Sequence, residues 1–291
     1  MDMKNCNLCP RNCGVDRLAG GLGYCRMPGQ LTVAHADLHH WEEPVISGNF
    51  GSGTVFFTGC GLGCIYCQNQ EISLENAGTA ITPEKLRSLF LQLIDDGAEN
   101  INLVTATQFL PWIMPALSPK LPVPVVYNCG GYESVKTLKS LEGLVDIYLP
   151  DLKYMDKSLS KKLSNAPDYP EVATAAILEM YRQTGDFILD EGLMKKGVLI
   201  RHLILPGETG NSLDVLDWIS GNFKGNHVLF SLMAQYVPHG KAKDFPPLDR
   251  PITEEEYAAV VSWAEISGLH QGFIQERTAA SDQYLPRFNM V

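Results

Sequence analysis

Three cysteines stand close together in the string TGCGLGCIYC. Cys60, Cys64 and Cys67 have the spacing C-x3-C-x2-C. Thiolates are soft ligands, and three of them on one loop are typical of an iron–sulfur cluster. The glycines between them allow the backbone to turn tightly and to point N–H groups at the sulfurs. Because no fourth cysteine stands beside them, one iron of a [4Fe-4S] cluster would stay open for a small molecule.

A second group of four cysteines lies nearer the start of the chain, with the spacing C-x2-C-x3-C-x11-C. Its members are Cys6, Cys9, Cys13 and Cys25. Four thiolates fit either a tetrahedral zinc ion or a second [4Fe-4S] cluster, and the sequence leaves both open. Such a centre would be a structural staple or an electron relay. The eighth cysteine, Cys129, stands apart from both groups, and we expect a small buried apolar residue there.

The composition narrows the class of protein. The chain has 291 residues and a net charge of −10, from 23 basic and 33 acidic side chains, which disfavours a nucleic-acid partner. It has no apolar run long enough to span a membrane, and its first residues lack the apolar middle of a secretory signal. We therefore expect a cytoplasmic protein with no membrane partner. In that reducing compartment, clustered cysteines favour metal ligation over disulfides.

Apolar strand-like and helix-like segments alternate from about residue 53 onward. We expect strands near residues 53–59, 101–105, 124–128, 144–149, 197–205, 227–233 and 272–276. We expect helices near residues 82–94, 108–117, 132–141, 168–184, 211–222 and 253–267, the first capped by Thr82 with Pro83 at its first position. This alternation predicts an α/β fold, a partial parallel (β/α)6 TIM-like barrel with its chemistry at the carboxyl ends of the strands. Residues 1–50 would form a Cys-rich N-terminal extension, and residues 51–291 the barrel domain.

Polar residues in and beside these strands need separate interpretation. Arg201 and His202 are neighbours in an apolar strand, so one should face the barrel interior and the other the helices. A buried arginine must be paired, and we expect His202 to be a hydrogen-bonded core residue. The stretch HADLHHWEEP, residues 35–44, carries three histidines and two glutamates. We interpret it as a solvated polar loop packed on the barrel rather than as a metal site.

Longer strings carry a resemblance. The C-x3-C-x2-C loop, with Tyr66 before its last cysteine, resembles the signature of the radical S-adenosylmethionine (radical SAM) superfamily. The strings CNLCPRNCGVDRLAGGLGYC, CIYCQNQEIS, YNCGGYESV, DIYLPDLKY and RHLILPGETGNSLDVLDWI resemble, in order, a prokaryotic group related to pyruvate formate-lyase activating enzyme. The resemblance covers nearly the whole chain, and it is far more specific for the group than for any substrate.

This resemblance implies a [4Fe-4S] cluster and SAM, whose reductive cleavage yields a 5′-deoxyadenosyl radical that abstracts hydrogen. The implied oxidoreductase would act as a glycyl-radical-enzyme activase on a protein glycine, with flavodoxin or ferredoxin as electron donor. A monovalent cation is implied beside Asp151-Leu152-Lys153, which resembles the D-x-K motif of such enzymes. The residues implied to contact SAM are Tyr66, Thr105, Thr107, Asn128, Gly130, Gly131, Asp151, Lys153, Arg201 and Gln235.

The chain departs from pyruvate formate-lyase activating enzyme in two places. VTATQFLP replaces the Gly-Gly-Glu segment after the second strand, and Gln235-Tyr236 stands where that enzyme has a histidine. These departures argue against pyruvate formate-lyase itself as the target. Three alternatives stay open: a radical SAM enzyme that modifies another peptide or a small molecule, a non-enzymatic iron–sulfur electron carrier, and a zinc-binding interaction module.

Overall fold

A curved sheet forms the centre of the molecule, and seven of its strands are parallel. The computed structural model describes residues 1–225 and 227–279, so the end of the predicted barrel domain lies outside the described residues. The strand order is β10-β9-β8-β6-β5-β4-β2-β1-β3. The parallel strands are β2 (Ser52–Phe57), β4 (Ile101–Val104), β5 (Val125–Cys129), β6 (Ile147–Pro150), β8 (Leu193–Leu203), β9 (Leu229–Met233) and β10 (Gly272–Ile274).

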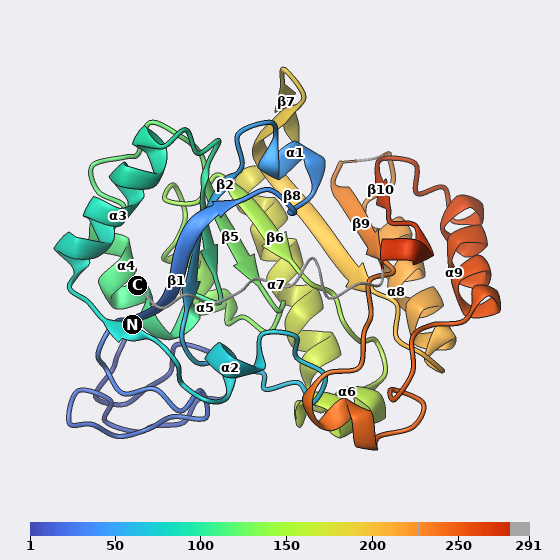
Figure 1. Cartoon of the computed structure of the whole chain (residues 1–291), viewed down its shortest axis with the longest axis horizontal. Coiled ribbons are helices and arrows are strands. Elements are labelled where there is room, and N and C mark those ends of the chain that lie inside the picture. Colours follow the sequence, from blue (N-terminus) through green and yellow to red (C-terminus); the bar gives the residue numbers. More distant parts are fainter. Residues whose placement is uncertain (226, 280–291) are drawn as a thin grey trace.

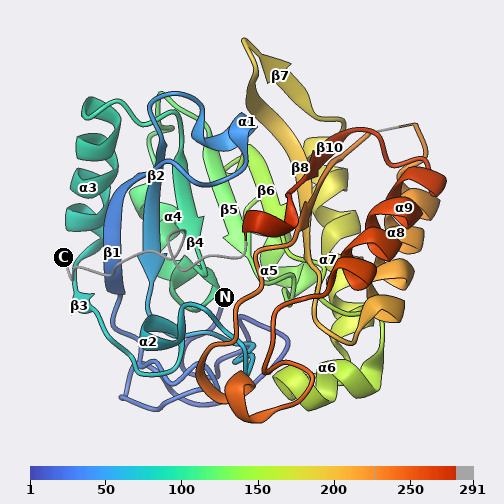
Figure 2. The ribbon, with the colours of Figure 1, turned by 45° about the vertical axis from the view of Figure 1, so that its right-hand side comes forward.

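Helices follow each of the first six parallel strands and surround one side of the sheet (Figures 1 and 2). They are α3 (Pro83–Asp95), α4 (Leu110–Ala116), α5 (Val135–Lys139), α6 (Lys157–Ser164), α7 (Tyr169–Thr184), α8 (Thr209–Asn222) and α9 (Glu254–Ile266). The sheet is not closed among the described residues, since β3 and β10 stand at its two edges. The predicted partial barrel of about six β/α units is therefore confirmed, and β10 corresponds to the last strand expected, near residues 272–276.

Helix α3 shows how local sequence positions an element. The side chain of Thr82 accepts a hydrogen bond from the Lys85 amide at 3.2 Å, and Pro83 opens the helix, as predicted. Leu86 and Phe90 then lie on one face at helical spacing and are fully buried against the sheet.

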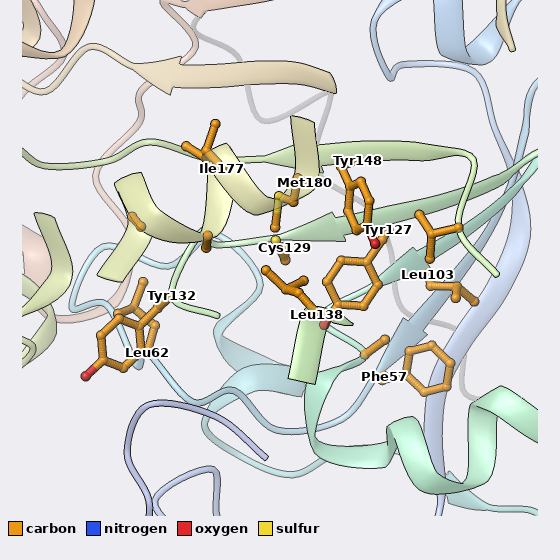
Figure 3. Packing of buried hydrophobic residues seen from close by; sticks show 14 of the residues in the cluster. Phe57, Leu62, Leu103, Tyr127, Cys129, Tyr132, Leu138, Tyr148, Ile177 and Met180 are labelled. Atoms are coloured by element: carbon orange, nitrogen blue, oxygen red, sulfur yellow. The ribbon is translucent and has the colours of Figure 1, made fainter. Parts of the chain in front are cut away.

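The strands alternate between two environments. Side chains such as Tyr127 and Tyr148 point outward into the layer beneath the helices, where Figure 3 shows them packed with residues of that layer. Their neighbours Val126 and Leu149 belong to a different cluster, which Ile46 of α1 (Pro44–Ser47) completes. Because successive side chains of a strand face opposite sides, this inner cluster fills part of the barrel interior.

Some elements were not predicted. β1 (Thr32–His39) pairs antiparallel with β2, and β3 (Thr79–Ala80) pairs with β1. β7 (Ile188–Asp190) pairs antiparallel with β8, and α2 (Gln70–Ser73) follows the three-cysteine loop. The interpretation of residues 35–44 as a solvated loop is wrong for its first part, since β1 joins the main sheet. The predicted boundary at residue 50 stays a prediction, although the sheet reaches into that segment.

Residues 1–31 contain no helix or strand and lie below the carboxyl ends of the parallel strands in Figure 1. Arg17 anchors this segment. Its side chain is 1% exposed and donates to the carbonyls of Met27 (3.1 Å), Pro28 (2.8 Å) and Gln108 (2.6 Å). No helix in the described part of the chain is long and apolar enough to cross a membrane.

Arg17→Ala should destabilise the protein by about 2 to 4 kcal/mol, because three buried carbonyls lose a charged donor at once. Urea unfolding of equally metal-loaded proteins measures the change. Arg277→Ala, which removes an exposed ion pair with Glu254, should cost less than about 1 kcal/mol. Equal effects of the two substitutions would contradict the anchoring role of Arg17.

Candidate metal and cofactor site

One cavity of about 340 Å³ connects both cysteine groups with the barrel interior. Its lining includes the seven cysteines predicted to bind metal: Cys6, Cys9, Cys13, Cys25, Cys60, Cys64 and Cys67. Nine of the ten residues predicted to contact SAM also line it: Tyr66, Thr105, Thr107, Asn128, Gly130, Asp151, Lys153, Arg201 and Gln235. The fold thus brings residues of six separate segments to one place. That they contact SAM stays a prediction.

Gly131 is the tenth predicted residue, and it is not among those that line the cavity. Its φ is +78°, and a Cβ there would lie 2.2 Å from the Asp151 carbonyl oxygen. Glycine is required at this position because the turn after β5 packs directly on the loop after β6.

Each sulfur of the three-cysteine loop accepts a hydrogen bond. The donors are the Leu62 amide to Cys60 (3.3 Å), the Ser164 hydroxyl to Cys64 (3.1 Å) and the Ser73 hydroxyl to Cys67 (3.3 Å). Donors aimed at sulfur stabilise the thiolate form, and such bonds are a feature of cluster-binding cysteines. This donor set fits a [4Fe-4S] cluster held by three thiolates.

Burial also shapes the chemistry of these thiols. The pKa of Cys60 is raised to about 12, first by burial and then by the neighbouring Cys64 and Cys67. Burial likewise raises the pKa of Cys67. A thiol in this state keeps its proton at neutral pH, so it is a poor nucleophile by itself. A bound iron centre supplies the positive charge that replaces the proton.

A chain of hydroxyl groups supports the loop from the far side. Tyr154 donates to the Tyr66 hydroxyl at 2.7 Å and lies 2.8 Å from the Ser164 hydroxyl, which in turn donates to Cys64. All three of these hydroxyl groups are buried. The loop after β6 and helix α6 therefore hold the middle cysteine in place.

The N-terminal cysteines are arranged around glycine. A Cβ on Gly23 would lie 3.5 Å from the Cys13 sulfur and 3.6 Å from the Cys25 sulfur, so glycine keeps the space between these two sulfurs open. The Tyr24 amide donates to Cys13 at 3.2 Å. Burial raises the pKa of Cys9 to about 12. Within residues 1–225 and 227–279, no group of three His, Cys, Asp or Glu side chains is arranged to hold a single metal ion.

Arg11 joins the two cysteine groups. It stands between Cys9 and Cys13 in sequence, and its guanidinium donates to the carbonyls of Gly61 (2.8 Å) and Leu62 (3.2 Å) in the three-cysteine loop. The same group lies 3.8 Å from the centre of the Tyr24 ring. A guanidinium has five N–H donors in a rigid, planar arrangement, so one arginine can bind several carbonyl groups at once. Arg11 therefore fixes the N-terminal segment against the loop.

Arg201 faces the barrel interior and binds three partners. Its guanidinium donates to the carboxylates of Asp151 (2.8 Å) and Glu42 (3.1 Å) and to the side-chain amide oxygen of Asn128 (2.7 Å). Lys153 also pairs with Asp151, at 2.6 Å. Burial alone would raise the pKa of Asp151, but the two cations outweigh it and lower that pKa. The predicted pairing of Arg201 is confirmed, and Asp151–Lys153 is a largely buried pair.

Sequence reasoning missed the glutamates of residues 35–44. Glu42 accepts hydrogen bonds from Asn102 and Asn128, each at 3.1 Å, besides pairing with Arg201. Glu43 is 9% exposed and lines the cavity. Burial raises the pKa of both carboxyl groups. Two adjacent glutamates directly before a proline were the one available signal, and their apolar surroundings come from strands distant in sequence.

Among the residues predicted to contact SAM, Thr107 and Gln235 form hydrogen bonds within the protein, and Thr105 has an unfavourable backbone conformation. The Thr107 hydroxyl donates to Glu133 at 2.7 Å, and burial raises the pKa of Glu133 to about 7. Thr105 has a φ of +57°, which is costly for a β-branched residue and often marks a functional site. The Gln235 side chain accepts a hydrogen bond from Gln275 at 3.2 Å.

Two predictions about core residues hold. His202 is 2% exposed and lies 2.7 Å from the Leu152 carbonyl and 2.9 Å from the Ser212 hydroxyl, on the helix side of β8. Cys129 is 3% exposed and, in Figure 3, lies among the packed side chains that include Leu138 and Met180. Neither residue belongs to the two groups of cysteines that are predicted to bind metal.

No family model matches the chain. The uncharacterised protein MJ0674 of Methanocaldococcus jannaschii is 31% identical over 277 residues, which are 90% of this chain and 75% of that protein. A variant of spore photoproduct lyase matches the structure with a TM-score of 0.50 and 10% identity, over 75% of this chain and 74% of that one. Streptococcus suis SuiB, crystallised with its precursor peptide SuiA, matches with a TM-score of 0.48 and 13% identity, over 75% of this chain. The chain spans 46% of the length of SuiB.

The three-cysteine loop directly follows β2, and spore photoproduct lyase has a similar fold. This similarity concerns the fold alone. The chain belongs to the same family as the uncharacterised protein MJ0674.

Loss of Cys64 should abolish the cluster, because the remaining two thiolates cannot hold it, whereas Cys129→Ala should leave the iron and sulfide content unchanged. Anaerobic reconstitution followed by iron and sulfide analysis measures both. A drop in iron content in Cys129→Ala equal to that in Cys64→Ala would contradict the assignment of ligands.

His202 should make the protein less stable in acid. Burial lowers its pKa from 6.5 to about 4, so between these values the unfolded chain binds a proton that the folded chain does not. Stability from this group is present above pH 6.5 and is lost as the pH falls toward 4, by about 2 kcal/mol between pH 7.5 and pH 5. Urea unfolding of His202→Gln at the two pH values should show a correspondingly smaller difference than the wild type, and an unchanged difference would refute this account.

Proposed function

We propose that this chain is a radical SAM enzyme, with a [4Fe-4S] cluster on Cys60, Cys64 and Cys67 and with SAM in the adjoining cavity. The observation that supports this most strongly is that three sulfurs, each with its own hydrogen-bond donor, share one cavity with a paired carboxylate and two cations. When bound, the cluster and SAM supply a 5′-deoxyadenosyl radical through one-electron cleavage of the sulfonium.

The residues of the cavity wall suit the methionine part of SAM. That part is a zwitterion, so its recognition calls for both a carboxylate and a cation close together. Asp151 and Lys153 provide this pair at 2.6 Å, and Asn128 adds an amide held by Arg201. These groups stand at the carboxyl ends of β5 and β6, where parallel α/β folds place their chemistry. A monovalent cation beside Asp151 stays a prediction.

For the reaction itself, we infer a glycyl-radical-enzyme activase-like role in the cytoplasm, with flavodoxin or ferredoxin as electron donor. The substrate would be a glycine of another protein, which loses one hydrogen atom from its Cα to the nucleoside. The sequence resemblance supports this finer assignment. The cavity also reaches the surface beside Trp41, which lines it and is 64% exposed, so a substrate segment has a route of entry.

For the N-terminal cysteines, we infer a second metal centre that is either a cluster or a zinc ion. Two observations support this. Both groups line the same cavity, and Gly61 of the three-cysteine loop lies so near Cys9 that a Cβ on it would be 3.4 Å from the Cys9 sulfur. A second cluster there would be close enough to relay electrons, whereas zinc would be only a staple. Metal analysis of the Cys60/Cys64/Cys67→Ala triple variant separates the two.

Anaerobically reconstituted wild type, reduced with dithionite and given SAM, should release 5′-deoxyadenosine, and Cys64→Ala should release none. With the correct glycyl-radical enzyme present, EPR should detect a glycyl radical on that partner. Cys129→Ala is the control and should retain wild-type cleavage.

Other outcomes decide between the alternatives. Nucleoside release without a radical on any candidate protein would favour modification of another peptide or a small molecule. Iron binding without nucleoside release would favour an electron carrier. Zinc without iron, and no absorption near 400 nm, would favour a zinc-binding module.

A further inference from the structure

The loop between β1 and α1 places two adjacent carboxylates inside the barrel. Glu42 is bound by three donors, from Asn102, Asn128 and Arg201. Glu43 follows directly. The residue is only 9% exposed, and it lines the cavity. Figures 1 and 2 show α1, which this loop enters, beside the sheet, and α1 contacts β8.

The hydrogen bonds of Arg201 and Lys153 go to groups other than Glu43. The three guanidinium nitrogens of Arg201 donate to Asp151, Glu42 and Asn128, and Lys153 donates to Asp151. Among the described residues, the Oε2 atom of Glu43 is buried and accepts no hydrogen bond. The Oδ1 atom of Asn102, whose amide holds Glu42, is likewise buried without a donor. Two buried acceptor atoms beside this network therefore have no hydrogen-bond donor.

The charges are unbalanced in the same direction. Three carboxylates, of Asp151, Glu42 and Glu43, face only two cations, Arg201 and Lys153. A buried carboxylate without a donor is costly, and a charged donor is the partner that relieves it best. Burial raises the pKa of Glu42 and of Glu43, and the charge of Arg201 offsets this only in part.

We propose that Glu43 binds a cationic group of the substrate, an alkylammonium such as a lysine side chain or another primary amine. That this amine belongs to a substrate rests on the proposed radical SAM function, whereas the binding of a cation at Glu43 does not. A hard metal cation is a poorer occupant, because it needs about six oxygen ligands and one oxygen of Glu43 lacks a partner. Glu43 and the three-cysteine loop line the same cavity, so an amine held at Glu43 lies in the cavity proposed for the cluster and SAM.

Calorimetric titration of the reconstituted holoprotein without SAM tests this binding site. The probes are n-butylammonium chloride, its neutral isostere n-butanol, and potassium chloride. Wild type should bind n-butylammonium and not n-butanol. Glu43→Gln should weaken n-butylammonium binding by about tenfold or more, because it loses a charge-assisted hydrogen bond. Glu75→Gln, at an exposed carboxylate, should bind like wild type.

Three results would overturn the proposal. If butanol and butylammonium bind equally well, or if neither binds, water alone satisfies the Glu43 oxygen. Tighter binding of potassium would assign the site to an inorganic cation. Unchanged affinity in a folded Glu43→Gln variant would place the amine elsewhere. If that variant fails to fold, as circular dichroism shows, the comparison of the three probes on wild type still decides.

The proposal and the proposed function fail separately. Protein that binds n-butylammonium but releases no 5′-deoxyadenosine would retain the amine site and lose the radical function. Protein that cleaves SAM but does not distinguish butylammonium from butanol would retain the function and lose the amine site.

Discussion

The positive charge of Arg201 inside the barrel is the constraint on which the site depends. A guanidinium keeps its proton in proteins, so a buried arginine must find anionic and carbonyl partners. Here Asp151, Glu42 and Asn128 fill that role, and they come from three different parts of the chain. Pairing with Arg201 therefore fixes the loop after β6, the end of β5 and the loop before α1 against β8. The inner wall of the cavity takes its shape from this one ion.

The three-cysteine loop is held from two sides in a comparable way. Arg11 donates to its backbone from the N-terminal segment, and Tyr154 and Ser164 support Cys64 from the loop after β6 and from α6. A short glycine-rich loop has little rigidity of its own, since glycine loses more conformational freedom on folding than other residues. Rigid neighbours on both sides supply the fixed geometry that a cluster and a bound cofactor need.

Much of the fold could be predicted because its signals are local. The cap of α3 at Thr82, the apolar spacing of its helix and the alternation of strands with helices all lie within short stretches. The alternation of side chains along a strand predicted that Arg201 and His202 face opposite sides. The structure shows that Arg201 is the one that faces the interior. Residues 35–44 could not be interpreted this way. HADLHHWEEP is polar, and nothing within it indicates that its first half pairs with β2 and that its two glutamates enter the barrel.

The sequence by itself determined the two groups of cysteines, the β/α repeat and the strand ends at which polar residues gather, because each depends on spacing along the chain. Only the tertiary structure decided which of those polar residues meet. Glu42 and Arg201 are 159 positions apart, and no local pattern relates them. Their contact exists because the curved sheet brings β1, β5 and β8 around one interior. In an interior of low dielectric constant, the neighbours that the fold provides determine whether each charge is stabilised or left without a partner.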